Sequence, residues 1–210
     1  MVSAIQIENY HHGDLRWALI DAALAALAEN SPGTLSLRGL ARATGVSATA
    51  VYRHFADKED LLAAIATEGF EGLSASMQQR LTQEPDAGRL RRLVILGEGY
   101  VDYAIAHPAH YRLMFGPRML SRSRHPALAT AAAQSYGMLE QAVSDAITAG
   151  ELPAMPEPVL STLFWSWVHG LAMLNNDGLL AHPELPGADE LSHDFGELLA
   201  SALNQFKPTE

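Results

Sequence analysis

Apolar residues recur at intervals of three and four along most of this chain, which is the spacing of one buried face of an α-helix. The two-residue alternation that indicates half-buried β-strands is not evident. The pattern therefore predicts an all-α fold of about nine helices, separated by clusters of Pro, Gly, Asn and Asp. The predicted helices cover residues 15–29, 37–44, 48–55, 57–83, 88–106, 108–115, 126–149, 157–175 and 188–205.

Two of the predicted helices, 37–44 and 48–55, are short and follow each other closely. Ser36 and Ser47 each precede one of them and can accept a hydrogen bond from its first turn as N-cap residues. Gly45 lies in the turn, where glycine tolerates the left-handed backbone conformation. Two short helices joined by a glycine-containing turn are typical of a helix-turn-helix, whose second helix enters the major groove of DNA.

The second helix of this pair carries polar residues that could contact DNA. Its first turn consists of small residues, which permit a close approach to base edges. Tyr52, Arg53 and His54 lie on its exposed side, and Lys58 opens the next helix, where an ammonium and free N–H groups can meet a phosphate. An ordinary α-hairpin, in which Tyr52 and His54 are surface residues, also fits the spacing. The predicted DNA contacts are Arg38, Ser47, Ala48, Thr49, Ala50, Tyr52, Arg53, His54 and Lys58.

The charge of the chain is unevenly distributed. The formal net charge of −10 excludes a polycation that coats nucleic acid without specificity. Residues 34–58, however, contain four basic side chains and one acidic side chain, a net +3, so the other 185 residues carry −13. We therefore expect an acidic body that repels DNA and a small basic head that can approach it.

Several classes of protein are excluded by what the sequence lacks. Cysteine does not occur, which removes disulfides, thiolate metal sites and cysteine nucleophiles. The first ten residues do not form a signal peptide, and no apolar run approaches the length of a membrane span, so we expect a cytoplasmic protein with no membrane partner. No glycine-rich phosphate loop or Gly-x-Ser-x-Gly motif is found, so we do not expect an enzyme.

The segment from Leu35 to Leu62, with Leu35-Ser-Leu-Arg-Gly-Leu-Ala-Arg-Ala-Thr-Gly-Val-Ser47 and Tyr52-Arg-His-Phe-Ala-Asp-Lys58, resembles the DNA-binding domain of TetR-family transcriptional regulators. The resemblance covers about residues 10–62. It implies that Tyr52, His54 and Lys58 contact phosphates and that residues 47–50 face the bases. The family usually has Thr or Ser where this chain has Ala50, so one phosphate-binding hydroxyl is missing here.

The second half of the chain extends this resemblance. The segments Tyr100–Phe115 and Trp165–Leu171 resemble the C-terminal domain of a TetR subgroup named after a tryptophan, histidine and glycine motif, and the lead-in at residues 10–16 resembles the same subgroup. The resemblance implies a DNA-binding domain at residues 1–62 and a helical ligand-binding and dimerisation domain at residues 63–210.

Two helices of the second half are expected to form the homodimer. Helix 157–175 is apolar nearly all round, which predicts burial on several sides. The last helix has apolar residues at heptad-like spacing, at Leu191, Phe195, Leu198, Ala202 and Phe206. The resemblance implies that the two helices pair with their mates across an isologous two-fold interface.

Aromatic and methionine side chains of the second half are candidates for the wall of an apolar ligand pocket. They are Tyr100, Tyr103, Tyr111, Met114, Phe115, Met138, Trp167 and His169. Ordinary core packing is the alternative for each of them taken separately. His107, His110, His125 and His169 raise the question of a metal, but no Asp or Glu stands at matching spacing, so no metal or other cofactor is predicted.

Together these features predict a homodimeric repressor that a small hydrophobic effector releases from a palindromic operator in double-stranded DNA. The long helix that starts near Lys58 would act as the lever between ligand and DNA. Two alternatives stay open. The same fold could act as an activator or without a ligand, or the chain could be a ligand-binding helical protein with a vestigial DNA head.

Overall fold

A computed structural model of the protein describes residues 12–29, 32–116, 120–180 and 195–204. These residues form α-helices, one 3-10 turn and their connections, with no strand among them, in agreement with the predicted all-α class. The helices are α1 (His12–Glu29), α2 (Leu37–Thr44), α3 (Ala48–His54), α4 (Lys58–Gln83), α5 (Arg89–Ala106), α6 (Pro108–Phe115), α7 (Pro126–Thr148), α8 (Glu157–Asn176) and α10 (Phe195–Asn204).

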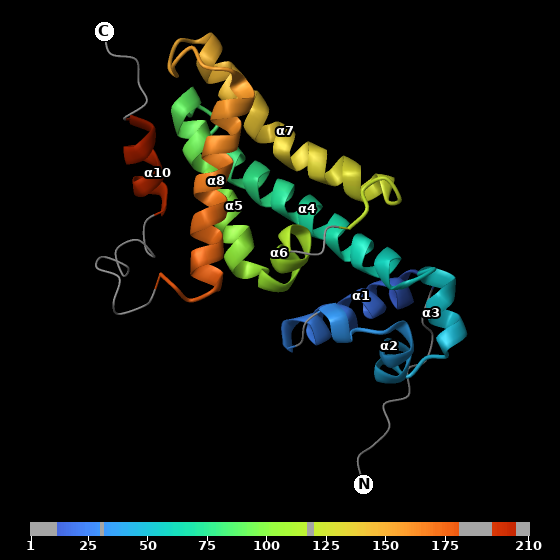
Figure 1. Ribbon diagram of the computed structural model, residues 1–210. Helices are drawn as coiled ribbons and strands as arrows, with labels where there is room; N and C mark the ends of the chain where they lie inside the picture. Colours follow the sequence, from blue (N-terminus) through green and yellow to red (C-terminus); the bar gives the residue numbers. More distant parts are fainter. Residues whose placement is uncertain (1–11, 30–31, 117–119, 181–194, 205–210) are drawn as a thin grey trace.

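The first three helices form a small head at one end of the molecule (Figure 1). Both predicted N-caps are confirmed, since the hydroxyl oxygens of Ser36 and Ser47 accept hydrogen bonds of 3.1 Å from the N–H groups of Gly39 and Ala50. Gly45 ends α2 in the left-handed conformation, with φ of 72°, as the turn requires. These local signals fix where the short helices begin and end.

Helix α4 joins the head to the rest of the protein (Figure 1). Its N-terminal half, with Leu61 and Ile65, packs into the core of the head, and its C-terminal half, with Leu73 and Met77, packs into a second core. The change from one core to the other lies between Phe70 and Leu73. A rigid helix of 26 residues therefore belongs to both cores and can transmit a displacement between them.

The body consists of the C-terminal half of α4 with α5, α6, α7, α8 and α10. Helices α4 and α5 can approach closely because Gly99 has no side chain. A Cβ atom at this position would lie only 2.8 Å from the Met77 Cα atom. Ion pairs that join Arg80 of α4 to Glu98 and Asp102 of α5 hold the same contact at its outer edge. No helix among the described residues is long and apolar enough to span a membrane.

Helix α8 differs from the expectation that it is buried on several sides. One face, with Leu160, Phe164 and Val168, is buried against the body, whereas Val159 and Met173 are 49% and 46% exposed. The apolar pattern shows that a face is apolar, but it does not distinguish burial within one chain from burial against another chain. Among the residues that the structure describes, α8 therefore leaves an apolar face uncovered.

Leu199 and Leu203 of the last helix, α10, are buried and belong to the body core. Within the predicted stripe, Ala202 is half-buried, Leu191 and Phe206 lie outside the described residues, and the side chains of Phe195 and Leu198 are not described either. The first helix begins at His12, three residues before the predicted residue 15.

Candidate nucleic-acid interface and ligand cavity

Helix α3 is held by one face and exposed on the other. Val51 is fully buried in the head core, and Phe55, which ends the helix, is 1% exposed. On the opposite side Tyr52 is 48% exposed, and Arg53 is exposed as well. The buried face fixes the orientation of α3, so the outer face is presented as a rigid surface.

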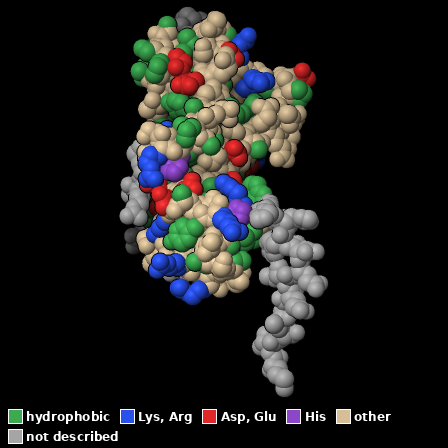
Figure 2. Space-filling view, turned by 90° about the vertical axis from the view of Figure 1, so that its right-hand side faces the viewer, with side chains coloured by type: hydrophobic (Ala, Val, Ile, Leu, Met, Phe, Trp, Pro, Cys, Tyr) green, Lys and Arg blue, Asp and Glu red, His purple; other side chains and the backbone are tan. Residues whose placement is uncertain are grey.

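The residues predicted to contact DNA lie on the accessible side of the head. Ala50, His54 and Lys58 are half-buried, and the exposed ones are Arg38, Ser47, Ala48, Thr49, Tyr52 and Arg53. Figure 2 shows Lys and Arg side chains over the lower part of the molecule, which is the head, and Asp and Glu side chains mainly above it. This agrees with the separation of charge in the sequence.

Lys58 has a structural contact besides its predicted role. Its ammonium donates a hydrogen bond of 3.0 Å to the carbonyl oxygen of Gly33, which lies in the turn before α2. Replacement of Lys58 would therefore disturb the head as well as any contact with DNA.

The N-terminus of α4, directly after α3, is clamped by the turn that precedes α7. The Asp57 carboxylate accepts a hydrogen bond of 2.9 Å from the Asp60 N–H and caps the helix. The Arg124 guanidinium contacts both Asp57 and Glu59, and the Ser121 N–H donates to Glu59 at 3.3 Å. The Asp60 N–H, together with Arg124, lowers the pKa of Asp57. We call this set of contacts the α4 clamp.

His125 completes the α4 clamp. Its Nε2 atom lies 3.7 Å from a Glu59 oxygen, and its Nδ1 atom lies 3.9 Å from an Asp60 oxygen. Nε2 is buried and has no hydrogen-bond partner among the described residues. Sequence reasoning considered His125 only as a metal ligand, and the described residues contain no group of three or more metal-binding side chains.

The body core contains a cavity of about 320 Å³ lined by residues of α4, α5, α6, α7, α8 and α10. This volume lies at the lower end of the range of small-molecule pockets. The wall is mainly apolar and aromatic, and it includes three of the residues predicted for a pocket, Tyr100, Phe115 and Trp167. Other wall residues include Phe70, Leu96, Tyr136, Leu139 and Trp165.

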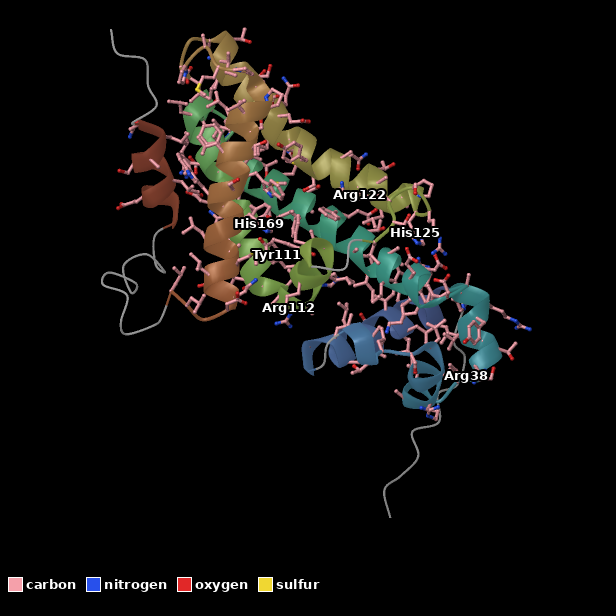
Figure 3. All side chains as sticks on the ribbon, viewed as in Figure 1. Arg38, Tyr111, Arg112, Arg122, His125 and His169 are labelled. Atoms are coloured by element: carbon pink, nitrogen blue, oxygen red, sulfur yellow. The ribbon has the colours of Figure 1, made fainter. Side chains whose placement is uncertain are left out.

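The other predicted pocket residues do not line this cavity. Tyr103 packs over Gly72, Met114 packs over Gly69, and Met138 packs against the body core. Tyr111 of α6 and His169 of α8 lie next to each other and bond to each other (Figure 3). Side-chain type identifies them as core residues, but only packing decides which core residues border a void.

Tyr111 and His169 form a hydrogen-bonded cluster with Tyr100. The two tyrosine hydroxyls lie 2.7 and 2.9 Å from Nδ1 of His169 and 3.2 Å from each other. Burial raises the pKa of Tyr100 to about 12, raises that of Tyr111 further and lowers that of His169. The three groups are therefore neutral at pH 7, and the cluster braces α5, α6 and α8 against one another.

Arg122 is a wall residue that the sequence did not indicate. It belongs to the turn before α7, and among the described residues it is the only charged side chain on the cavity wall. A turn has no hydrophobic periodicity, so no pattern relates Arg122 to a cavity formed by distant helices.

The comparisons with known proteins agree with this architecture. A model of the tetR family of bacterial regulatory proteins matches residues 19–65, and a model of a tetracyclin repressor-like C-terminal domain matches residues 93–196. The chain belongs to the TetR family, whose members are transcriptional regulators and not enzymes. The two matched segments correspond to the head and the body.

Two individual proteins that resemble this chain share no more than about a third of its residues in the aligned segments. An uncharacterised HTH-type transcriptional regulator of Mycobacterium tuberculosis is 30% identical over 117 residues, which cover 55% of this chain and 49% of the relative. The chain thus matches about half the length of its curated relatives. A solved protein of unknown function from Rhodococcus sp. RHA1 is 29% identical with a TM-score of 0.74, covering 95% of this chain and 96% of the other.

A second solved structure supports the fold. It is a regulatory protein of the tetR family, also from Rhodococcus RHA1, and it is 20% identical with a TM-score of 0.71. The match covers 93% of this chain and 98% of that chain.

Proposed function

We propose that this chain is a homodimeric repressor that binds a roughly palindromic operator through its head and is released by a small hydrophobic molecule. The observation that carries the proposal is the geometry of α3, whose inner face is locked by Val51 and Phe55 and whose outer face presents Tyr52 and Arg53. We assign DNA binding to residues 1–62, and ligand binding and dimerisation to residues 63–210.

The residues of α3 divide into two roles. The small residues of its first turn, 47–50, allow the helix to approach base edges in the major groove. Tyr52, Arg53 and His54, with Lys58 at the start of α4, contact phosphates and set the orientation of the helix. Because the base-facing side chains are small, part of the specificity comes from DNA shape.

The second copy of the chain covers the apolar face of α8. Val159, Met173 and Leu174 are each at least 40% exposed, an uncommon amount of apolar surface for one helix of a water-facing domain. An isologous dimer would bury this face against the same face of its mate and would set the two α3 helices in successive major grooves, about 34–36 Å apart or a multiple of that spacing.

Repression and release follow from a shared conformational equilibrium. The cavity lies beside the C-terminal half of α4, and the head lies on its N-terminal half. A ligand that binds one position of α4 more tightly shifts the dimer toward that position, and it weakens DNA binding by the same factor by which DNA weakens ligand binding.

A gel-shift assay on the DNA upstream of the gene tests the proposal. We expect a sequence-selective shift with the native chain and a strongly weakened shift with Tyr52→Ala. No selective shift at physiological salt would indicate a vestigial head and would refute the proposal. Reporter expression with the operator placed before a promoter separates repression from activation.

Sedimentation or size-exclusion measurements test the dimer. We expect Val159→Arg to yield a monomer, because two like charges would face each other near the two-fold axis. Thr130→Arg, which adds the same charge on the exposed side of α7, is the matched control and should remain a dimer. A native chain that is monomeric at micromolar concentration would contradict this part of the proposal.

A further inference from the structure

Arg122 is an exposed arginine that lines the edge of an apolar cavity. The described part of the chain provides no carboxylate within ion-pair distance of its guanidinium and no hydrogen bond to it. Its neighbour Arg124, two residues further along the same turn, is paired with Asp57 and Glu59. One arginine of the turn therefore binds the N-terminus of α4, while the other lines the cavity and has no ion pair or hydrogen bond with the residues that the structure describes.

The wall around Arg122 limits which ligands complement it. Apart from Arg122, the wall offers aromatic and aliphatic side chains and a few hydroxyl and indole groups, such as Ser135 and Tyr136. A neutral apolar ligand would gain nothing from Arg122, because the exposed guanidinium would stay hydrated beside it. A cationic amphiphile would be repelled. A ligand with an apolar tail and a carboxylate head group complements both the apolar wall and Arg122. Guanidinium binds carboxylate through two parallel hydrogen bonds.

The turn that carries Arg122 also carries the α4 clamp. Ser121 and Arg124 both contact Glu59, and His125 lies beside Glu59 and Asp60. The Asp60 carboxylate in turn accepts a hydrogen bond of 3.0 Å from the Ala56 N–H, immediately after the end of α3. The path from Arg122 to the recognition helix thus consists of one short turn and one helix N-terminus.

We infer that the cavity takes an amphipathic carboxylate whose head group pairs with Arg122, and that the turn at residues 121–125 transmits its binding to α3 through the α4 clamp. The inference rests on the proposed function, since it specifies the ligand of that cavity and its route to the DNA-binding head. A head group that draws Arg122 inward displaces Ser121 and Arg124, and with them the N-terminus of α4.

The ligand class is tested with three probes of equal chain length, decanoate, 1-decanol and decylammonium. Binding is followed by the fluorescence of Trp165 and Trp167, which line the cavity, in a Trp17→Phe background. We expect decanoate to bind about tenfold or more tightly than the other two, since a charge-assisted hydrogen bond contributes on that order. Arg122→Gln should remove this preference, and Arg122→Lys should retain part of it.

Arg112→Gln is the matched control for the binding experiment. Arg112 is an exposed arginine on α6 that does not line the cavity, and in Figure 3 it points away from His169 and Tyr111. It should leave all three affinities unchanged. Equal binding of the three probes, or a decanoate preference that survives Arg122→Gln, would overturn the inference while leaving a ligand cavity. Binding of none of them would overturn both the inference and a cavity ligand of this size.

The transmission route is tested separately by the effect of decanoate on DNA affinity. In the native chain we expect decanoate to weaken the gel shift on the upstream DNA. In Arg124→Gln we expect decanoate to bind as before but to change DNA affinity by at least about fivefold less, a factor within the usual range of allosteric coupling. If Arg124→Gln responded to decanoate like the native chain, the route through the α4 clamp would be wrong. DNA binding itself, measured without decanoate, reports independently on the proposed function.

Discussion

The side chains proposed for function lie on the outer surface of the head, whereas in the body they lie inside the core. In the head, the core serves as a support, and the side chains proposed for function, such as Tyr52 and Arg53, project from its outer surface. In the body, the side chains proposed for function, such as Tyr100 and Trp167, belong to the core and border a void within it. Helix α4 contributes to both cores.

This difference has a physical consequence for how each part responds to substitution. The head holds a rigid surface, so any loss of core packing should disturb the orientation of α3. The body already tolerates a cavity of about 320 Å³, so some wall residues have fewer neighbours to lose. The two parts should therefore differ in the cost of the same chemical change.

The largest expected effect is on Phe55 of the head. Phe55→Ala removes a side chain that is 1% exposed, and it should lower the free energy of unfolding by about 3–5 kcal/mol and abolish the gel shift. Phe115→Ala, at the cavity wall, should cost clearly less, because Phe115 is half-buried and borders a void. Urea denaturation measures both. An equal or larger loss with Phe115→Ala would contradict the distinction between the two cores.

The next effect concerns Glu68, where α1 contacts α4. Burial raises the pKa of Glu68 from 4.5 to about 7, although Arg16 lies 3.9 Å away and opposes the shift. Asp21 and Glu71 add to it. The folded chain thus binds this proton more tightly than the unfolded chain, and the resulting stability is present below pH 4.5 and lost as the pH rises through about 7.

We expect the free energy of unfolding to fall by up to about 3 kcal/mol over that range through Glu68. Glu68→Gln should remove this part of the pH dependence, which urea denaturation at several pH values measures. Glu140→Gln, at an exposed carboxyl of α7 that does not contribute to the shift of Glu68, is the control and should keep it. A pH profile of Glu68→Gln that matches the native profile would show that Glu68 titrates normally.

The head was predictable because its signals are local in the sequence. Ser36, Gly45 and Ser47 each act within a few residues of themselves, and the structure confirms the caps and the turn that they predicted. Val51 and Phe55 stand four residues apart, which is the spacing of one helix face, and both are buried. Short-range hydrogen bonds and helix periodicity need no knowledge of the rest of the fold.

The site in the body was only partly predictable because its contacts are distant in the sequence. Arg124 meets Glu59 across 65 residues, and Arg122 lines a cavity formed by six helices. Tyr111 and His169 have the composition of a pocket but bond to each other, 58 residues apart. The apolar pattern of α8 predicted burial on several sides, but one of its faces is exposed in this chain. A pattern shows that a face is apolar and does not show which chain covers it.

A smaller effect is expected for Ala133, an exposed residue of α7 that lines the cavity. Ala133→Leu should fill part of the cavity opening and weaken decanoate binding about tenfold, or about 1.4 kcal/mol, with a change in stability under about 0.5 kcal/mol. Ala127→Leu, at an exposed position of α7 away from the cavity, should alter neither quantity. Tryptophan fluorescence and urea denaturation measure the two effects, and unchanged decanoate affinity in Ala133→Leu would place the ligand elsewhere.

The central claim is that the outer face of α3 binds the DNA backbone, and the salt dependence of operator binding tests it most directly. Arg53→Ala should weaken binding and reduce the slope of log K against log salt by about 1, because one phosphate contact is lost. Arg112→Ala, which removes the same charge from the body, should leave the slope unchanged. A slope that is unaltered in Arg53→Ala, or reduced equally in both variants, would contradict the account.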